Sequence, residues 1–100
     1  MAKVAPAPLA RPLSAVAREI QRDYDAKGKP LHYAAAPYVL AMSHLGSMSD
    51  RFYEDSAESV VMYAVSNLGS WRGEVAARVK AELKAAVNAH RVSQGKKPLY

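Results

Sequence analysis

Apolar residues recur along the chain at helical spacing, and stretches rich in glycine and proline separate these segments. The first apolar set occupies positions 13, 16, 17, 20 and 24, which fall on one face of a helix. Pro12 suits the first turn of such a helix, Gly28 suits its C-terminal cap, and Pro30 forbids its continuation. The pattern therefore predicts a helix over residues 13–26.

Residues 37–46 repeat the pattern on a shorter scale, from Pro37 to Gly46. The apolar side of this second helix comprises Tyr38, Ala41, Met42 and Leu45. The next stretch, SMSDRFYED, is predicted to form a short helical turn that brings Met48, Phe52 and Tyr53 inward. Ser47 followed by Asp50 resembles an N-terminal capping pattern.

A third helix is predicted between Asp55 and Gly69. Asp55 stands three residues before Glu58, as in a capping box with aspartate in place of serine. The segment is apolar around most of its circumference, and Tyr63 lies off its main apolar face. A helix of this kind is expected at the centre of a domain, surrounded by the other helices.

The fourth and longest helix is predicted over residues 71–91, capped by Ser70. Its apolar face comprises Ala76, Val79, Leu83, Ala86 and His90. Glu74, Arg78 and Glu82 are spaced by four residues, which predicts a ladder of opposite charges on the solvent side.

These segments together predict an all-α fold: a compact single domain of four main helices plus a short fifth turn. The helical domain spans residues 12–92. Residues 1–11 are expected to form a flexible Pro/Ala arm with a polyproline II preference, and residues 93–100 a flexible basic tail.

Composition narrows the possible functions. The chain has no cysteine, which excludes disulfides and thiolate chemistry, and it shows neither a signal peptide nor a span-length apolar run, so a cytoplasmic location is expected. The net charge of +5 divides into +3 for residues 1–30, −3 for residues 31–70 and +5 for residues 71–100. This asymmetry would allow self-association or binding of an acidic partner by the C-terminal third.

Catalytic and metal-binding patterns are missing from the sequence. His32, His44 and His90 stand in different segments without metal-ligand spacing, and no phosphate loop or nucleophile elbow occurs. The acidic residues at positions 50, 54, 55 and 58 cluster where a helix begins, so stabilisation of the helix N-terminus accounts for them. We therefore expect no enzymatic activity, no cofactor and no bound metal.

The segment NLGSWRGE holds the only tryptophan, between two glycines at a predicted helix break. Trp71 is expected to pack in the core and lock two helices together, whereas Arg72 is the expected contact with a partner. Gly73, which weakens a helix, is expected to allow another backbone to approach closely.

Two further sets complete the predicted contact surface. Lys80, Lys84 and Arg91 fall on one stripe of the fourth helix, which is either a solvated face or a site for phosphates or an acidic protein surface. Arg51 and Tyr53 lie in a loop-like stretch and form a second candidate patch.

The stretches PYVLAMSHL and DSAESVVMYAVSNLGSWRGEVAARVKAEL resemble a family of small, poorly characterised helical proteins of proteobacterial phages and integrated mobile elements. This resemblance covers about half the chain and is most specific from SWRGE to KAEL. It implies a protein that acts by binding a host protein or ribonucleoprotein complex, as inhibitors of bacterial defence systems of the anti-CRISPR type do.

The leading hypothesis is a non-enzymatic binding protein of a mobile element. The alternative is a nucleic-acid accessory protein that uses the basic fourth helix and the tail. A third hypothesis is a structural oligomer in which the acidic middle of one copy meets the basic end of another.

Overall fold

A computed structural model describes residues 11–100, so most of the predicted N-terminal arm lies outside the described residues. The described chain forms four helices and one small hairpin. The elements are α1 (Leu13–Ala26), α2 (Ala36–Met42), β1 (Arg51–Phe52), β2 (Asp55–Ser56), α3 (Ala57–Ser66) and α4 (Glu74–Ser93). The mainly helical fold is confirmed, and an antiparallel two-stranded hairpin takes the place of the predicted fifth turn.

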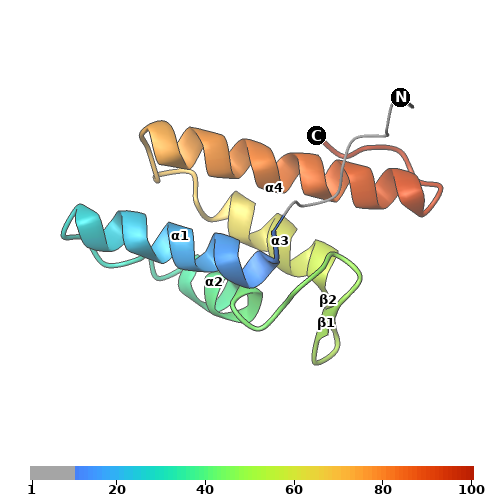
Figure 1. Ribbon diagram of the computed structural model, residues 1–100, viewed down its shortest axis with the longest axis horizontal. Helices are drawn as coiled ribbons and strands as arrows, with labels where there is room; N and C mark the ends of the chain where they lie inside the picture. The colour runs from blue at the N-terminus through green and yellow to red at the C-terminus, as the bar shows by residue number, and fades with distance from the viewer. Residues whose placement is uncertain (1–10) are drawn as a thin grey trace.

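The four helices pack as a closed ring. α1 contacts α2, α2 contacts α3, α3 contacts α4, and α4 returns to α1 (Figure 1). The apolar composition of α3 predicted a central helix surrounded by the other three. This prediction is wrong, because α3 is one member of the ring. Its open side carries the exposed Tyr63 and Ser66.

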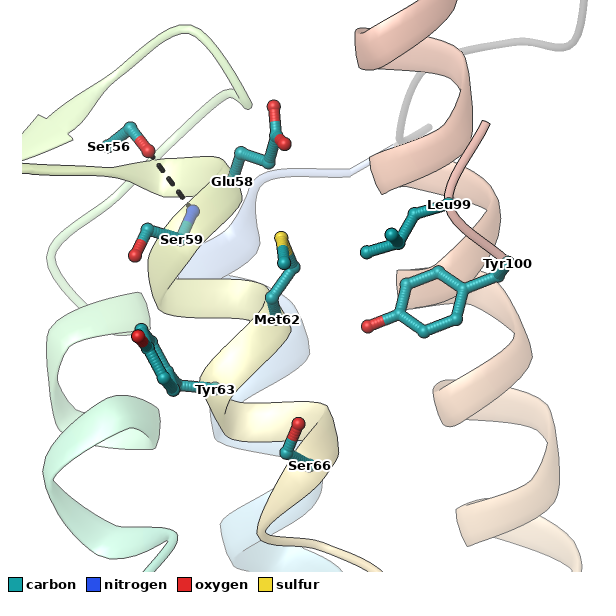
Figure 2. A pocket seen from close by; sticks show the side chains of 8 residues that line it. All are labelled: Ser56, Glu58, Ser59, Met62, Tyr63, Ser66, Leu99 and Tyr100. Carbon is teal, nitrogen blue, oxygen red and sulfur yellow. Dashed lines mark hydrogen bonds between the residues drawn. The ribbon is translucent and has the colours of Figure 1, made fainter. Parts of the chain in front are cut away.

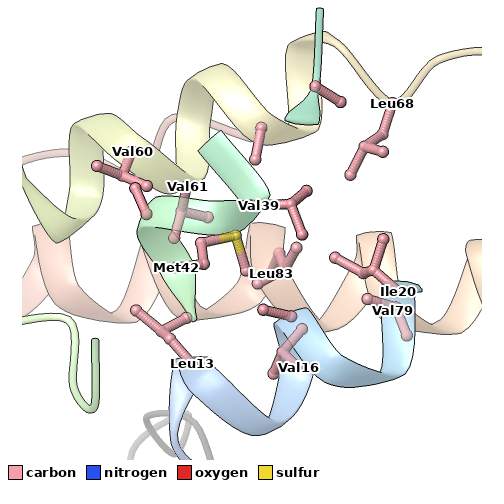
Figure 3. Close-up of a cluster of buried hydrophobic side chains, with 14 of the residues drawn as sticks. Leu13, Val16, Ile20, Val39, Met42, Val60, Val61, Leu68, Val79 and Leu83 are labelled. Carbon is pink, nitrogen blue, oxygen red and sulfur yellow. The ribbon is translucent and has the colours of Figure 1, made fainter. Parts of the chain in front are cut away.

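The hydrophobic core fills the inside of this ring (Figure 3). Every helix contributes to it, and no described polar or charged residue is buried there. Burying one valine, leucine, isoleucine or methionine side chain stabilises the fold by roughly 1.5–3 kcal/mol. The largest fully buried side chains are Leu13, Val16, Ile20, Met42, Val61, Leu68, Val79, Leu83 and Val87.

α1 has the predicted bounds, whereas α2 ends at Met42, before the predicted Gly46. The early end of α2 has a structural reason. The N–H groups of Leu13 and Ser14, in the first turn of α1, have no partner within their own helix. They donate to the carbonyls of Gly46 and Leu45, at 2.8 and 2.9 Å, so the chain after α2 serves as a cap for α1.

The N-cap of α3 is Ser56, whose hydroxyl accepts a hydrogen bond from the Ser59 N–H at 3.1 Å. The predicted capping role of Asp55 is wrong, because Asp55 lies in β2. Asp50 instead stabilises the turn before the hairpin: its carboxylate accepts from the N–H groups of Gly46 and Ser47 at 2.8 and 3.0 Å. The hydrogen bond from the Ser47 N–H is the main cause that lowers the pKa of Asp50, and the bond from the Gly46 N–H adds to it.

α4 begins at Glu74 and not at the predicted Trp71, and Ser70 does not cap it. Its N-cap is Gly73, with φ 111°, a conformation that side chains other than hydrogen rarely adopt. A Cβ at this position would also lie 3.3 Å from the Lys27 ammonium nitrogen. The bend at Gly73 leaves Trp71 outside the helix, free to turn its ring into the core.

No helix in the described part of the chain is both long enough and apolar enough to cross a membrane.

Candidate interaction surfaces

The Trp71 junction joins the end of α1 to the start of α4. The Trp71 side chain is 2% exposed, its ring stacks on Tyr24 at 5.9 Å, and its Nε1 donates to the Asp23 carboxylate at 2.7 Å. Burial of the indole agrees with the structural role that the sequence predicts for it.

Two lysines hold the backbone of this junction. The Lys80 ammonium donates to the Trp71 carbonyl and the Lys27 ammonium to the Arg72 carbonyl, both at 2.6 Å. Lys27 also pairs with Asp23 at 2.8 Å. Burial lowers the pKa of Lys80, and the nearby Arg72 and Lys84 add to this effect. Lys80 therefore fixes the bend between the helices, which leaves it less free to contact a partner.

The other residues of the predicted basic stripe differ in environment. Arg91 pairs with Glu58 at 2.9 Å and donates to the Lys97 carbonyl at 2.8 Å. Lys84 is exposed, with its ammonium 5.5 Å from the centre of the Tyr100 ring. The stripe thus has one exposed lysine and two cations engaged within the fold.

Arg72 is exposed beside the junction. Its guanidinium makes no hydrogen bond or ion pair with any residue of the range 11–100. Of the four cations predicted as contacts on the C-terminal third, Arg72 and Lys84 are the two that are exposed.

The predicted charge ladder along α4 does not form. Arg78 instead reaches across to Glu19 of α1, and Arg11 bridges Glu19 and Glu82 at 2.6 and 2.8 Å. The hydrogen bond from Arg78, followed by that from Arg11, lowers the pKa of Glu19. These ion pairs connect α1 to α4. Residue spacing within one helix cannot predict such contacts between helices.

The C-terminal residues fold back along α4 (Figure 1). The Asn88 side chain organises them: its Oδ1 accepts from the N–H groups of Leu99 and Tyr100, both at 2.9 Å, and its Nδ2 donates to the Tyr100 carbonyl at 3.0 Å. The sequence does not indicate this contact, because a contact between an asparagine side chain and a backbone leaves no periodic signal.

A cleft of about 440 Å³ separates α3 from this tail (Figure 2). Met62 points into it from α3, and Leu99 and Tyr100 lie on the tail side. Its one carboxylate, Glu58, is already paired with Arg91, and the Ser56 hydroxyl already caps α3. The lining residues thus offer hydroxyl groups and an apolar surface to a bound molecule.

The β1–β2 hairpin projects from the ring of helices (Figure 1). Arg51 pairs with Ser56 and Phe52 with Asp55, which leaves Tyr53 and Glu54 at the tip. The Tyr53 side chain is 86% exposed and has φ 57°, the one positive φ outside glycine among residues 11–100. The Arg51 guanidinium donates to the Glu54 carbonyl and so braces the turn.

Aromatic contacts connect the hairpin to the helices. The Tyr53 ring meets Phe52 edge-on at 4.7 Å, and Phe52 stacks on His44, just after α2, at 5.7 Å. At the other end of the α2–α3 pair, Tyr38 stacks on the exposed Tyr63 at 5.3 Å.

The predicted inward position is correct for Met48 but wrong for Tyr53, which is exposed as its prediction as a contact residue requires. Tyr63 was not among the predicted contact residues, although its place off the apolar face of the helix indicated exposure.

The left-handed backbone at Tyr53 has an energetic cost. For a residue with a Cβ, this conformation costs roughly 1–2 kcal/mol relative to the right-handed one. Glycine or asparagine would remove most of that cost, and packing against Phe52 is the sole contact of the Tyr53 ring with another aromatic group in the described chain. The two-residue turn itself requires the positive φ, so the fold explains the backbone conformation but not the choice of an exposed tyrosine at this position.

Residues 11–100 contain no group of three or more His, Asp or Glu side chains placed to hold a metal ion. No protein-family model matches the chain, and neither the curated proteins nor the solved structures provide a significant match.

Proposed function

We propose that this chain is a non-enzymatic binding protein that acts through protein–protein contact, with the β1–β2 hairpin as its principal contact. The observation that carries this proposal is Tyr53, which is 86% exposed at the tip of a braced turn and held with positive φ. Tyrosine and arginine are over-represented among the residues that dominate binding energy, and Arg51 stands beside it.

The charge around the hairpin favours a protein partner. Glu54 and Asp55 are exposed there, and residues 31–70 carry a net charge of −3. A negative surface repels the phosphates of a nucleic acid and complements a basic protein surface. The preferred partner is therefore a protein with a basic patch beside a pocket for an aromatic ring.

The biological setting follows from the resemblance to small proteins of phages and mobile elements. Such proteins benefit the element by occupying a host complex, so the proposed partner is a host protein or ribonucleoprotein complex of a bacterial defence system. Inhibition by contact needs no catalytic group, in keeping with a surface of aromatic rings and charges.

A comparative capture experiment tests the contact surface. The wild-type chain, Tyr53→Ala and Tyr33→Ala are immobilised separately, and the proteins retained from a proteobacterial lysate are quantified by mass spectrometry. Tyr33 is a matched control because it is 85% exposed but lies outside the hairpin. We expect a stoichiometric partner that wild type and Tyr33→Ala retain and Tyr53→Ala loses at least about tenfold, equivalent to about 1.4 kcal/mol. Equal retention by all three chains would contradict the proposal.

The proposed inhibition of a defence system has its own test. The chain is expressed in a proteobacterial strain with an active CRISPR–Cas system, and plaque formation by a targeted phage is counted. We expect wild type to restore plaques and Tyr53→Ala to restore fewer. If wild type fails in strains with each major type of system, the proposed target class is wrong, although a protein contact could still exist.

A second candidate function is nucleic-acid binding by exposed cations of the C-terminal third. The exposed Arg72 and Lys84, with Lys96 and Lys97 of the tail, favour it. Titration of labelled duplex and single strands at low and high salt would detect it, because binding through phosphates weakens steeply as salt rises. No binding at low salt would eliminate this alternative.

A further inference from the structure

An apolar groove of about 700 Å³ follows the C-terminal half of α4. Ala85, Ala86 and Ala89 line its helix side, which we call its floor. Met48 and its serine neighbours line it from the loop before the hairpin, and Pro98 and Tyr100 line it from the tail. This groove is separate from the cleft between α3 and the tail, although Tyr100 borders both.

Much of this apolar surface is open in the described chain. The Val92 side chain is 57% exposed and that of Tyr100 is 47% exposed. Exposed apolar side chains along a concave surface are typical of a binding site. The question is therefore which segment covers them.

Arg11 marks one end of the groove. Its guanidinium bonds to both carboxylate oxygens of Glu82, at 3.0 and 2.8 Å, and Glu82 lies one turn before Ala85 and Ala86 on α4. Two residues further along, the Leu13 N–H bonds to the carbonyl of Gly46, the residue before Ser47 of the groove wall. The chain thus enters the described fold between the floor and one wall of the groove.

Residues 4–10, immediately before this anchor, have the sequence VAPAPLA. All seven are apolar. In a polyproline II conformation they would span about 20 Å, at roughly 3.1 Å per residue. The helix between Ala85 and Ser93 rises by only about 12 Å, at roughly 1.5 Å per residue. The segment is therefore long enough to follow the whole groove.

The chemistry of residues 4–10 also suits the groove. Prolines restrict the backbone of the segment in advance, so ordering it in a groove costs less entropy than ordering a flexible segment. Proline-rich segments commonly dock in grooves lined by aromatic rings, and Tyr100 and His90 both border this one.

We propose that residues 4–10 occupy this groove in the same molecule, so that the arm before Arg11 is an internal ligand of α4. The Arg11–Glu82 pair sets the point of entry, and Leu9, the bulkiest apolar side chain of the segment, covers the alanine floor. Because the tether makes docking intramolecular, the effective concentration of the arm is on the order of millimolar. The groove is consequently closed to external apolar peptides. This inference does not depend on the function proposed for the hairpin.

A spin label tests the proposal directly, because the chain contains no cysteine. The full-length Ala7→Cys chain carries a nitroxide, and amide signals are compared with the nitroxide oxidised and reduced. We expect loss of peak intensity at residues 47–49 and 85–93, with signals at residues 74–80 retained. No selective loss along the groove would overturn the proposal.

A mixing experiment tests whether the arm occupies the groove of its own molecule. In a mixture of isotope-labelled wild type and unlabelled spin-labelled chain, we expect the groove signals to persist. Their loss would show exchange of arms between two copies, which would contradict docking in the same molecule.

Adding Leu9→Asp to the spin-labelled chain should restore the groove signals without changing the circular dichroism. Ala2→Asp introduces the same charge outside residues 4–10 and should leave the intensity loss unchanged. Equal behaviour of the two variants would also overturn the proposal.

Discussion

The Trp71 junction and the β1–β2 hairpin each place an aromatic residue beside an arginine in a bend, yet they use these residues in opposite ways. Trp71 is 2% exposed, its indole N–H donates to Asp23, and two lysines hold the carbonyls of the bend. The buried hydroxyl of Tyr24, whose ring stacks on the indole, has no hydrogen-bond partner among residues 11–100. Tyr53 is 86% exposed and its backbone is strained.

The comparison shows that residue type alone does not identify a contact surface. Cations of the C-terminal third gave the strongest sequence signal for binding, but Lys80 and Arg91 stabilise the fold. The weaker signal, Arg51 and Tyr53, belongs to a hairpin whose two-residue turn requires positive φ, and an exposed tyrosine occupies that position although glycine or asparagine would fit it with less strain. What distinguishes the two regions is whether the aromatic ring is buried and held by contacts within the chain, as Trp71 is, or exposed, as Tyr53 is.

The largest expected effect is that of Trp71→Ala. Removal of a buried indole, with its stacking on Tyr24 and its bond to Asp23, should lower the free energy of unfolding by about 3–5 kcal/mol. Urea denaturation followed by circular dichroism measures this. Arg72→Ala, the matched neighbour, should change stability by less than about 0.5 kcal/mol. Similar losses in the two variants would remove the contrast between core and surface at the junction.

The second largest effect is expected from acid, which should weaken the contacts between α1 and its neighbours. The pKa of Glu19 is lowered first by the hydrogen bond from Arg78, and that of Asp23 first by the bond from Lys27. A carboxylate whose pKa is lower in the folded state stabilises the fold above its unfolded pKa, about 4, and this stabilisation is lost as the pH falls through the folded pKa.

Urea midpoints measured from about pH 6 down to about pH 3 test this expectation. The wild-type midpoint should fall below about pH 4.5. Glu19→Gln should have a lower midpoint at neutral pH and a flatter acid dependence. A wild-type slope retained in full in both Glu19→Gln and Asp23→Asn would show that other groups carry the acid response.

A smaller loss is expected from Lys80→Ala. This variant leaves the Trp71 carbonyl without its bond from the ammonium, which should lower the free energy of unfolding by about 1 kcal/mol. Lys84→Ala, one turn further along α4, should cost less than about 0.5 kcal/mol because Lys84 is exposed. If Lys84→Ala costs as much as Lys80→Ala, Lys80 has no special structural role.

The smallest effect on stability is expected from Tyr53→Gly, which should be more stable than the matched variant Tyr53→Ala. Glycine adopts positive φ freely, so relief of strain should offset the lost contact with Phe52, and Tyr53→Gly should be up to about 1 kcal/mol more stable than Tyr53→Ala. Thermal unfolding of the two variants checks this. Both should be equally defective in partner capture, which separates the role of the ring from that of the backbone.

The sequence predicted the parts of the fold that depend on local periodicity. α1 has its predicted ends because apolar spacing, Pro12 and Gly28 all agree. The start of α4 was misplaced because Ser70 resembles a cap, whereas the unusual φ of Gly73 and the burial of Trp71 decide the boundary. The hairpin was missed because strands of two residues are too short to show alternation.

Long-range contacts limited the prediction of the candidate surfaces. Nothing within α4 indicates that Arg78 pairs with Glu19, or that Arg91 pairs with Glu58. Of the six predicted contact residues, Tyr53, Arg72 and Lys84 are the three that are exposed and make no hydrogen bond or ion pair with residues 11–100. The Lys84 ammonium lies 5.5 Å from the centre of the Tyr100 ring, so Tyr53 and Arg72 best represent the two competing surfaces.

Amide hydrogen exchange of the chain, free and in complex with its captured partner, tests most directly whether the hairpin is the binding surface. The account predicts protection on binding at residues 51–56 and along the adjoining part of α3, with exchange at residues 71–80 unchanged. Protection centred on residues 71–80, with an unchanged hairpin, would contradict it.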